Sequence, residues 1–235
     1  WFLIDTGLVD HFFPEIRGMR LEQDPIHRHK DVLTHTLAVV ENVRPDAHPT
    51  FDFRLTRLAA LFHDIGKPKT RGYKNGKGVT FHHHEVVGAR MTRDRMRALK
   101  YSNEDVEAVT ELVNLHLRSH TYQMGWTDSA VRRYVRDAGD LLTHLHVLTR
   151  ADCTTRNQKK ADRLARIYDD LEVRIERLAA EEELAAIRPD LDGAEVMELL
   201  KLKPSREVGL ALDFLLELRL EHGPLVKERA TEELF

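Results

Sequence analysis

The chain is poor in cysteine and lacks long apolar runs. Cys153 is the only cysteine among 235 residues, which excludes a disulfide within the chain and fits a reducing cytoplasm, where we expect the protein. No stretch approaches about 18 consecutive apolar residues, so we expect no membrane span, and no secretory signal is recognisable. With 42% hydrophobic residues, 32% charged residues and a formal charge of -3, the composition is typical of a soluble globular protein with a buried core.

Alternation of apolar and polar residues, the pattern of strands, is nearly absent as well. Most segments carry apolar residues at spacings of three and four, which predicts an all-α protein. The exception is a loop rich in Gly and Lys over 71–79, where Asn75-Gly76 favours at most one short β-hairpin. We expect a helix and turn over 1–16 that end near Pro14, a polar loop over 25–30, and helices over the ranges 31–43, 51–64, 84–100, 103–117, 128–138, 140–153, 158–186, 194–200 and 205–222.

A histidine and an aspartate stand side by side in the stretch A-A-L-F-H-D-I-G-K-P-K, residues 59–69. His63 and Asp64 close an apolar helical run that Gly66 and Pro68 then end. A neutral imidazole nitrogen and a carboxylate oxygen are both good ligands for divalent metal ions, so the pair is a candidate metal site. The competing explanation is a helix end in which the histidine is buried and the aspartate bonds to the backbone.

Further candidate ligands lie on the apolar stripes of other expected helices, where side chains point inward. Asp152 takes a position where a leucine would be expected, and an unpaired buried carboxylate costs several kcal/mol unless a cation or strong donors compensate it. The histidines with inward positions are His35, His84 and His116. His82 and His83 compete with His84, and His120, one turn after His116, competes with His116. We expect the remaining candidates His27, His29, His144 and His146 at the surface or at polar rims.

The order His35, His63-Asp64, His84, His116, Asp152 resembles the H...HD...H...H...D pattern of the HD-domain superfamily of metal-dependent phosphohydrolases. D-V-L-T-H-T-L, L-F-H-D-I-G-K-P, F-H-H-H-E-V-V-G-A and T-R-A-D are similar to its motif blocks. The resemblance implies a helical bundle with one or two divalent ions, of Mn, Ni, Fe, Co, Zn or Mg. It implies that His35, His63, Asp64 and Asp152 hold the first ion, and that His84 and His116 bind a second ion or the phosphate. Asp64 and Lys67 would act in catalysis, with Lys67 contacting a substrate phosphate.

A narrower resemblance covers essentially the whole chain. L-I-D-T-G-L-V-D-H-F-F-P-E-I, Y-K-N-G-K-G-V-T-F-H-H-H-E and L-D-G-A-E-V-M-E-L-L-K-L-K-P-S-R-E-V-G resemble the C-terminal part of bacterial CCA-adding tRNA nucleotidyltransferases with an HD domain, actinobacterial members above all. It implies a neck-like lead-in over 1–24, an HD domain over 25–157 and a helical body and tail over 158–235 that binds tRNA. In that family a catalytic nucleotidyltransferase head precedes this region; its motifs do not occur here, and the chain opens on Trp1, so we expect a processed protein or a fragment that lacks the head.

The second half also carries basic stripes that can neutralise RNA phosphates. One is formed by Arg132, Arg133 and Arg136 on a single helix, and another contains Arg156, Lys159 and Lys160, followed by Arg163 and Arg166. The competing explanation is a solvated helix face with local ion pairs to Asp162, Asp169 and Asp170. The Asp190-Leu191-Asp192 triplet mimics a two-carboxylate nucleotidyltransferase site, but no strand pair holds it, so we interpret it as a loop and helix cap.

Three functions remain open on these patterns. The first is a phosphohydrolase of the phosphatase or 2',3'-cyclic phosphodiesterase type that acts on nucleotides or RNA ends, as part of a CCA tRNA nucleotidyltransferase in tRNA 3'-end maturation or repair. The second is a non-catalytic module that binds tRNA and keeps a vestigial metal site. The third is a free-standing HD nucleotidase unrelated to tRNA. The patterns leave the oligomeric state open.

Overall fold

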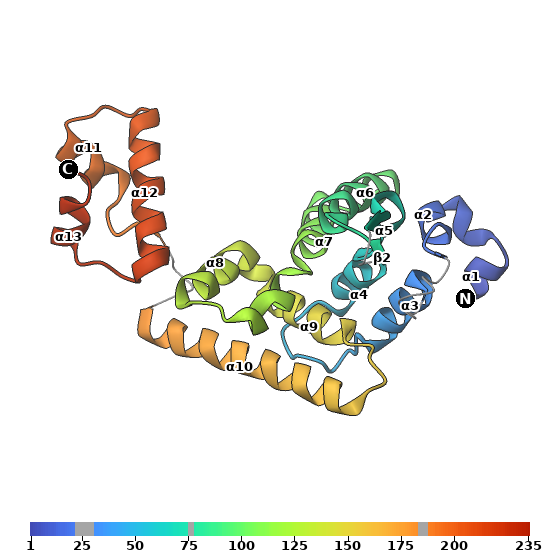
Figure 1. Ribbon diagram of the computed structural model, residues 1–235. Helices are drawn as coiled ribbons and strands as arrows, with labels where there is room; N and C mark the ends of the chain where they lie inside the picture. Colours follow the sequence, from blue (N-terminus) through green and yellow to red (C-terminus); the bar gives the residue numbers. More distant parts are fainter. Residues whose placement is uncertain (22–30, 75–77, 183–187) are drawn as a thin grey trace. The chain divides into compact units, whose positions relative to one another are not determined.

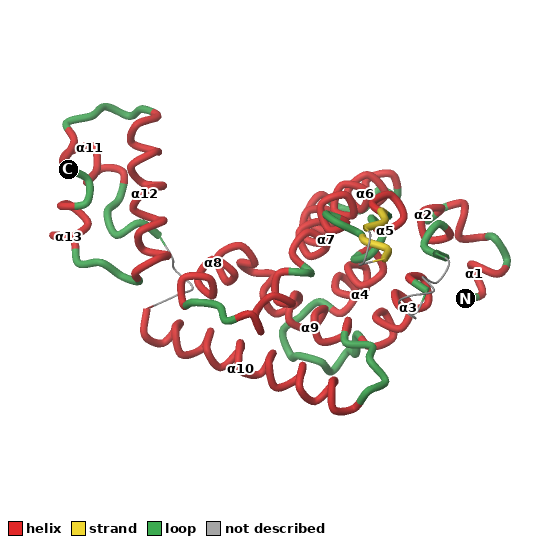
Figure 2. The backbone as a smooth tube through the Cα atoms, in the orientation of Figure 1, coloured by secondary structure: helices red, strands yellow, loops and turns green. Residues whose placement is uncertain are grey.

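The computed structural model describes residues 1–21, 31–74, 78–182 and 188–235. These ranges are mostly helical, as the apolar spacing predicts (Figures 1 and 2). The polar loop expected over 25–30 and the Asn75-Gly76 turn lie outside them. The elements in chain order are α1 (Phe2–Asp5), η1 (Leu8–His11), α2 (Pro14–Arg17), α3 (Val32–Asn42), α4 (Phe53–Phe62), α5 (Lys67–Thr70), β1 (Gly72–Lys74), β2 (Gly78–Thr80), α6 (His84–Ala98), α7 (Asn103–Leu115), η2 (Arg118–Met124), α8 (Asp128–Ala138), η3 (Gly139–Leu141), α9 (Leu142–Asp152), α10 (Gln158–Glu182), α11 (Gly193–Leu200), α12 (Arg206–His222) and α13 (Lys227–Glu232). None of the described helices is long and apolar enough to cross a membrane.

Side-chain caps explain where several helices begin. Asp31, Asp52, Ser102 and Thr127 each precede a helix and accept a hydrogen bond from a backbone N–H of its first turn. Asp192 caps α11 through a capping box with Glu195, which confirms the helix-cap interpretation of the Asp190-Leu191-Asp192 triplet. These caps place the helix starts within about two residues of the sequence predictions.

The first 17 residues depart from the expectation of a helix that ends near Pro14. They form three short helical segments, because Gly7 adopts a left-handed φ of 76° between α1 and η1. Pro14 begins α2 instead of ending a helix. The first position of a helix tolerates proline because its missing N–H would have no partner inside the helix. The expectation about Pro14 is therefore wrong.

The hairpin expected near 71–79 is present as two antiparallel strands. β1 and β2 pair with Tyr73 opposite Val79. They form the only sheet within the described ranges, and it is drawn in yellow in Figure 2. The all-α fold with one short hairpin is thus confirmed.

The chain divides into two compact units. The first unit comprises residues 1–120 and 140–168. Within it α4 contacts α3, α6, α7 and α9, so α4 is the central helix. Its side chain Phe62 is fully buried, together with Leu33, Met96, Leu112, Leu145 and Leu148 from the surrounding helices. The end of this central helix carries His63 and Asp64.

The second unit comprises residues 121–139 and 169–235. Its core contains the buried side chains Leu191, Val196, Val208, Leu215 and Ala230. The limits of these units differ from the domain boundaries expected at residues 24 and 157. α8 belongs to the second unit because it packs against α12, and the single helix α10 contributes to both units. The boundaries of the evolutionary domains stay a prediction.

Candidate metal centre

His63 and Asp64 occupy the sharp turn between α4 and α5, and both are only 1% exposed. His63 is the C-cap of α4, and Gly66 is the N-cap of α5. A Cβ on Gly66 would lie 2.2 Å from the carbonyl oxygen of His84 and 2.7 Å from the backbone nitrogen of Gly88. Glycine at position 66 therefore allows the first turn of α6 to approach α5. This approach brings His84 next to Asp64.

The first group of converging atoms contains His35, His63, Asp64 and Asp152. His35 Nε2 lies 2.8 Å from Asp152 Oδ1 and 3.7 Å from Asp64 Oδ2. His63 Nε2 lies 3.3 Å from Asp64 Oδ2, 3.4 Å from His35 Nε2 and 3.8 Å from Asp152 Oδ1. Two ligand atoms that each bind one ion at about 2.1 Å lie roughly 3.0–3.4 Å apart at tetrahedral or octahedral angles. The separations among His35, His63 and Asp64 lie at or near this range, and Asp152 reaches the group through its contact with His35.

A second group meets the first at Asp64. Asp64 Oδ1 lies 3.3 Å from His84 Nε2, while Oδ2 faces the first group. One ligand atom from each of Asp64, His84 and His116 lies within 4.8 Å of the other two. The rings of His116 and His63 are 5.4 Å apart between centroids. Asp64 could therefore supply a ligand atom to both groups.

Backbone carbonyls orient three of the histidines in the same way. The Nδ1 atoms of His63, His84 and His116 lie 2.8, 2.8 and 2.6 Å from the carbonyl oxygens of Ala60, Phe81 and Val113, three residues earlier in each case. A proton on Nδ1 that is donated to a carbonyl leaves the lone pair of Nε2 for a metal ion. His116 Nε2 is buried and has no hydrogen-bond partner among the described residues. The donors thus fit a divalent ion that binds N and O ligands.

The electrostatics keep both carboxylates ionised. Burial raises the pKa of a carboxyl group, but the charges of His63 and Lys67 hold the pKa of Asp64 well below its ordinary value. Burial also raises the pKa of Asp152, but the neighbouring His120, His35 and His63 together hold it well below its ordinary value. Burial lowers the pKa of His116 to about 3, so its imidazole is neutral at pH 7. For His63 burial acts in the same direction, but the neighbouring Asp64 raises its pKa to about 9.

Lys67 stands beside the shared carboxylate. Its Nζ lies 2.6 Å from Asp64 Oδ2 and 5.7 Å from the ring centroid of Phe81. The side chain is 22% exposed, so its ammonium group connects the buried cluster to solvent. This position suits a cation that contacts a substrate anion.

The rival histidines separate clearly in the structure. His84 is buried in the cluster, whereas His82 and His83 are exposed. His120 was expected to compete with His116 as a ligand. Its Nε2 instead lies 3.3 Å from Asp152 Oδ2, at the edge of the first group. The sequence analysis also missed Thr154, whose Oγ1 lies 3.0 Å from His35 Nδ1. Its position two residues after Asp152 is the only signal in the sequence that could have suggested it.

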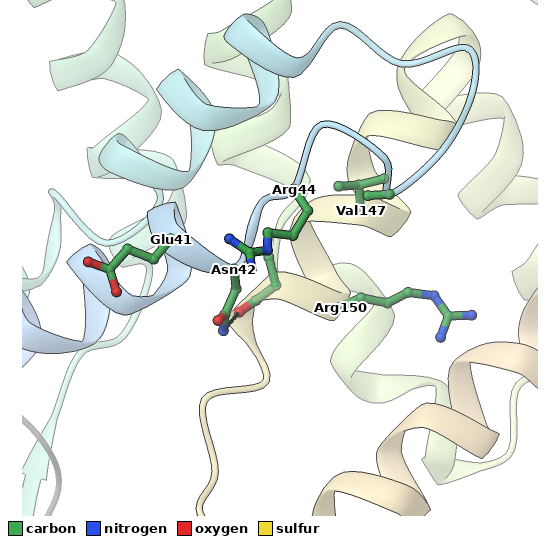
Figure 3. Close-up of a pocket in the computed structure, with 7 residues that line it drawn as sticks. Glu41, Asn42, Arg44, Val147 and Arg150 are labelled. Carbon is green, nitrogen blue, oxygen red and sulfur yellow. Dashed lines mark hydrogen bonds between the residues drawn. The ribbon is translucent and has the colours of Figure 1, made fainter.

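A pocket of about 510 Å³ lies between the end of α3, the loop that follows it and α9. Its lining contains none of the expected metal ligands (Figure 3). The side chains of Arg44 and Arg150 extend away from each other in Figure 3, so they do not form an arginine clamp for a phosphate. Asn42 Nδ2 donates a hydrogen bond to the carbonyl oxygen of Ala151 and ties α3 to α9 here.

The basic residues expected at an RNA interface fall into two classes. Arg132 is buried, and its guanidinium donates hydrogen bonds to the carbonyl oxygens of Leu220 and Glu221 at the end of α12. Arg133 and Arg136 form ion pairs with Glu217 of α12. The residues around the start of α10 are exposed and form no ion pair with any residue that the structure describes: Arg156, Lys159, Lys160, Arg163 and Arg166. The basic residues around the start of α10 are therefore the ones whose charges face solvent.

Known proteins are similar in sequence to most of this chain. A family model described as HD domain matches residues 32–157. An A-adding tRNA nucleotidyltransferase of Deinococcus radiodurans is 36% identical over 218 residues, which cover 91% of this chain and 48% of that protein. A CC-adding tRNA nucleotidyltransferase of Thermus thermophilus is 34% identical over 232 residues, with 96% and 49% covered. The chain therefore spans about half the length of these two relatives.

Proposed function

The chain belongs to the HD domain family, and on this basis we propose that it is a metal-dependent phosphohydrolase. The observation that carries the proposal is that ligand atoms of His35, His63 and Asp64 lie within 4.8 Å of one another, as do those of Asp64, His84 and His116, while Asp152 contacts His35. Five helical segments contribute these residues, so their meeting requires the complete fold of the first unit. Asp64 and Asp152 are largely buried, and buried ionised carboxylates are costly unless cations or strong donors compensate them.

Each residue has a distinct task in this proposal. His35, His63, Asp64 and Asp152 hold one divalent ion, and His84 and His116 hold a second ion together with Asp64 or contact the phosphate. A bound divalent ion supplies positive charge that activates water and offsets the charge of a phosphoester. Lys67 exchanges its contact with Asp64 for a substrate phosphate oxygen, which it binds as a point charge. The identity of the ion is left open among Mn, Ni, Fe, Co, Zn and Mg, because N and O donors suit several of them.

RNA ends and nucleotides are the substrates that we propose. The names of the two relatives refer to addition of A or CC to tRNA, which supports a tRNA-related role for this chain as well. We propose phosphatase or 2',3'-cyclic phosphodiesterase chemistry on such ends, within a CCA tRNA nucleotidyltransferase that acts in tRNA maturation or repair. The nucleotidyltransferase head stays a prediction, as does the cytoplasmic location.

A second candidate function is a tRNA-binding module without catalysis. The exposed basic residues around the start of α10, Arg156, Lys159 and Lys160, favour it, since solvent-facing cations on a helix can neutralise RNA phosphates. Arg132, Arg133 and Arg136 stay predicted RNA contacts, although their bonds to α12 support a structural role instead. Binding of tRNA without hydrolysis of any phosphoester would favour this second function.

The proposal is tested by hydrolysis of p-nitrophenyl phosphate and 2',3'-cyclic AMP in the presence of Mn²⁺ or Ni²⁺. His84→Asn removes a buried candidate ligand, and His83→Asn is its matched control, because His83 is exposed and asparagine tolerates the left-handed φ of 59° at that position. We expect His84→Asn to lose most of the activity and His83→Asn to keep it. Equal activity of the two variants, or no hydrolysis by the parent protein, would contradict the proposal.

A further inference from the structure

The candidate ligands are supported in two different ways. His63, His84 and His116 lie at helix ends and use the backbone carbonyl three residues earlier. His35 lies within α3, and its Nδ1 instead contacts a side chain, Oγ1 of Thr154, at 3.0 Å. With Nδ1–H donating to Thr154 Oγ1, Nε2 of His35 keeps its lone pair toward Asp152 and Asp64. The orientation of His35 thus depends on a hydroxyl group that comes from another segment.

Asp152 also depends on a side chain. Its Oδ1 faces His35 Nε2 at 2.8 Å, while its Oδ2 lies 3.3 Å from His120 Nε2. The contact of the His120 ring with Oδ2 restricts the carboxylate, whose other oxygen faces the first group. Asp152 ends α9, and Thr154 lies in the turn that follows. The backbone N–H of Thr154 donates a hydrogen bond to the carbonyl oxygen of Asp152 at 2.8 Å. This short segment thus contains both a candidate ligand and the residue that supports another ligand, His35.

The two ligands with side-chain supports are also the more exposed ones. The side chains of His35 and Asp152 are 19% and 15% exposed, against 2% for His63 and Asp64. Packing from all sides restricts the buried ligands, and their carbonyl partners are parts of the backbone. Ligands on the open side have fewer packing contacts, so hydrogen-bonded supports are what restricts their rotamers.

We propose that Thr154 and His120 are positioning residues that set the affinity of the first metal position by orienting His35 and Asp152. This inference rests on the proposed function, since it requires that the cluster binds a divalent ion. Loss of a hydrogen-bonded support of a metal ligand weakens metal binding by about 10–100-fold. Neither residue binds the ion directly in this assignment. We therefore expect their substitution to weaken metal affinity without changing the number of ions bound per chain at saturating metal.

Thr154→Val and Thr154→Ser test the first half of the proposal. Valine keeps the shape of threonine without the hydroxyl, and serine keeps the hydroxyl. We measure the dissociation constant of Co²⁺ by competition with a chromogenic chelator in the full chain. We expect Thr154→Val to bind about 10–100-fold more weakly than the parent and Thr154→Ser to bind within about threefold of it. Equal affinities of parent and Thr154→Val would overturn this half.

His120→Leu and His120→Gln test the second half, because glutamine offers an N–H donor that can replace Nε2 of histidine. We expect weaker Co²⁺ binding and an altered visible spectrum of bound Co²⁺ for His120→Leu, and recovery of both for His120→Gln. An unchanged affinity and spectrum in His120→Leu would overturn this half.

The readouts separate this inference from the proposed function. If the parent protein binds no Co²⁺, the proposed function fails and this inference fails with it. If the parent binds Co²⁺ and Thr154→Val and His120→Leu bind equally well, the inference alone fails. Thermal unfolding in excess chelator is the folding control. A variant that melts like the parent without metal but gains less stability from Co²⁺ supports a positioning role.

Discussion

The two compact units use charged and polar side chains in opposite ways. In the first unit, His63, Asp64, His84 and His116 are buried and converge on each other, and His116 Nε2 has no hydrogen-bond partner among the described residues. In the second unit the buried Arg132 donates to backbone carbonyls of α12. A buried polar group that its own protein satisfies stabilises the fold, whereas a buried cluster of ligand atoms that face each other is suited to bind a cation. Burial alone therefore does not identify a functional site.

The largest expected effect concerns two glycines, one in each unit. Gly66→Ala should destabilise the chain by about 3 kcal/mol, because a Cβ at position 66 would meet the backbone of α6 at 2.2 Å. A Cβ on Gly209, within α12, would meet no described atom within 4 Å, so Gly209→Ala should stabilise by about 1 kcal/mol through helix propensity. Urea unfolding measures both. Equal effects of the two substitutions would contradict the close approach of α5 and α6.

A somewhat smaller effect is expected from Arg132→Gln in the second unit. The variant loses charge-assisted hydrogen bonds to the end of α12, and we expect it to cost about 2–3 kcal/mol of unfolding free energy. Arg133→Gln is the matched control, since exposed ion pairs contribute little to stability. If both variants unfold like the parent, the contrast between a buried, hydrogen-bonded arginine and a surface pair is wrong.

A smaller effect is expected on RNA affinity, which should depend on the exposed basic residues near the start of α10 more than on the paired arginines of α8. Replacing Arg156, Lys159 and Lys160 by glutamine should weaken tRNA binding and reduce the slope of log affinity against log salt by about 0.7–0.9 for each phosphate that is no longer neutralised. Arg133→Gln with Arg136→Gln serves as the control, because both arginines pair with Glu217. Filter binding over a range of salt concentrations gives the slopes. A larger decrease in the control would assign the RNA surface to α8.

The smallest effect concerns a histidine outside the cluster. His144 Nε2 accepts a hydrogen bond from the backbone N–H of Asp52, and burial lowers the pKa of His144 below its ordinary value of 6.5. The unfolded chain therefore takes up this proton first as the pH falls, and the stability that His144 contributes is lost as the pH falls through 6.5. His144→Gln should flatten the pH dependence of unfolding below this ordinary pKa. An unchanged profile would contradict this assignment.

The sequence predicted those features that depend on residues close together in the chain. Apolar spacing and capping residues such as Asp31 and Ser102 predicted the helices, because both act within one or two turns. The motif order predicted the residues that the first unit brings together, including His84 rather than His82 or His83. Their roles as ligands stay predictions.

Other features depend on contacts between distant segments, which no local pattern contains. Thr154 supports His35 across 119 residues, and Arg132 binds a carbonyl 88 residues away. The sequence alone did not indicate the acidic partners of the basic stripe of α8, because these partners lie on α12, far away in the chain. The contact of His120 with Asp152 was missed for the same reason, since helical spacing relates His120 only to His116.

We expect the buried cluster of the first unit to hold divalent metal. The most direct measurement is the metal content per chain after purification without chelator, for the parent and for Asp64→Ala, whose carboxylate faces both groups of ligands. We expect one or two equivalents of metal in the parent and almost none in the variant. A parent chain without metal, with both proteins folded alike, would contradict it.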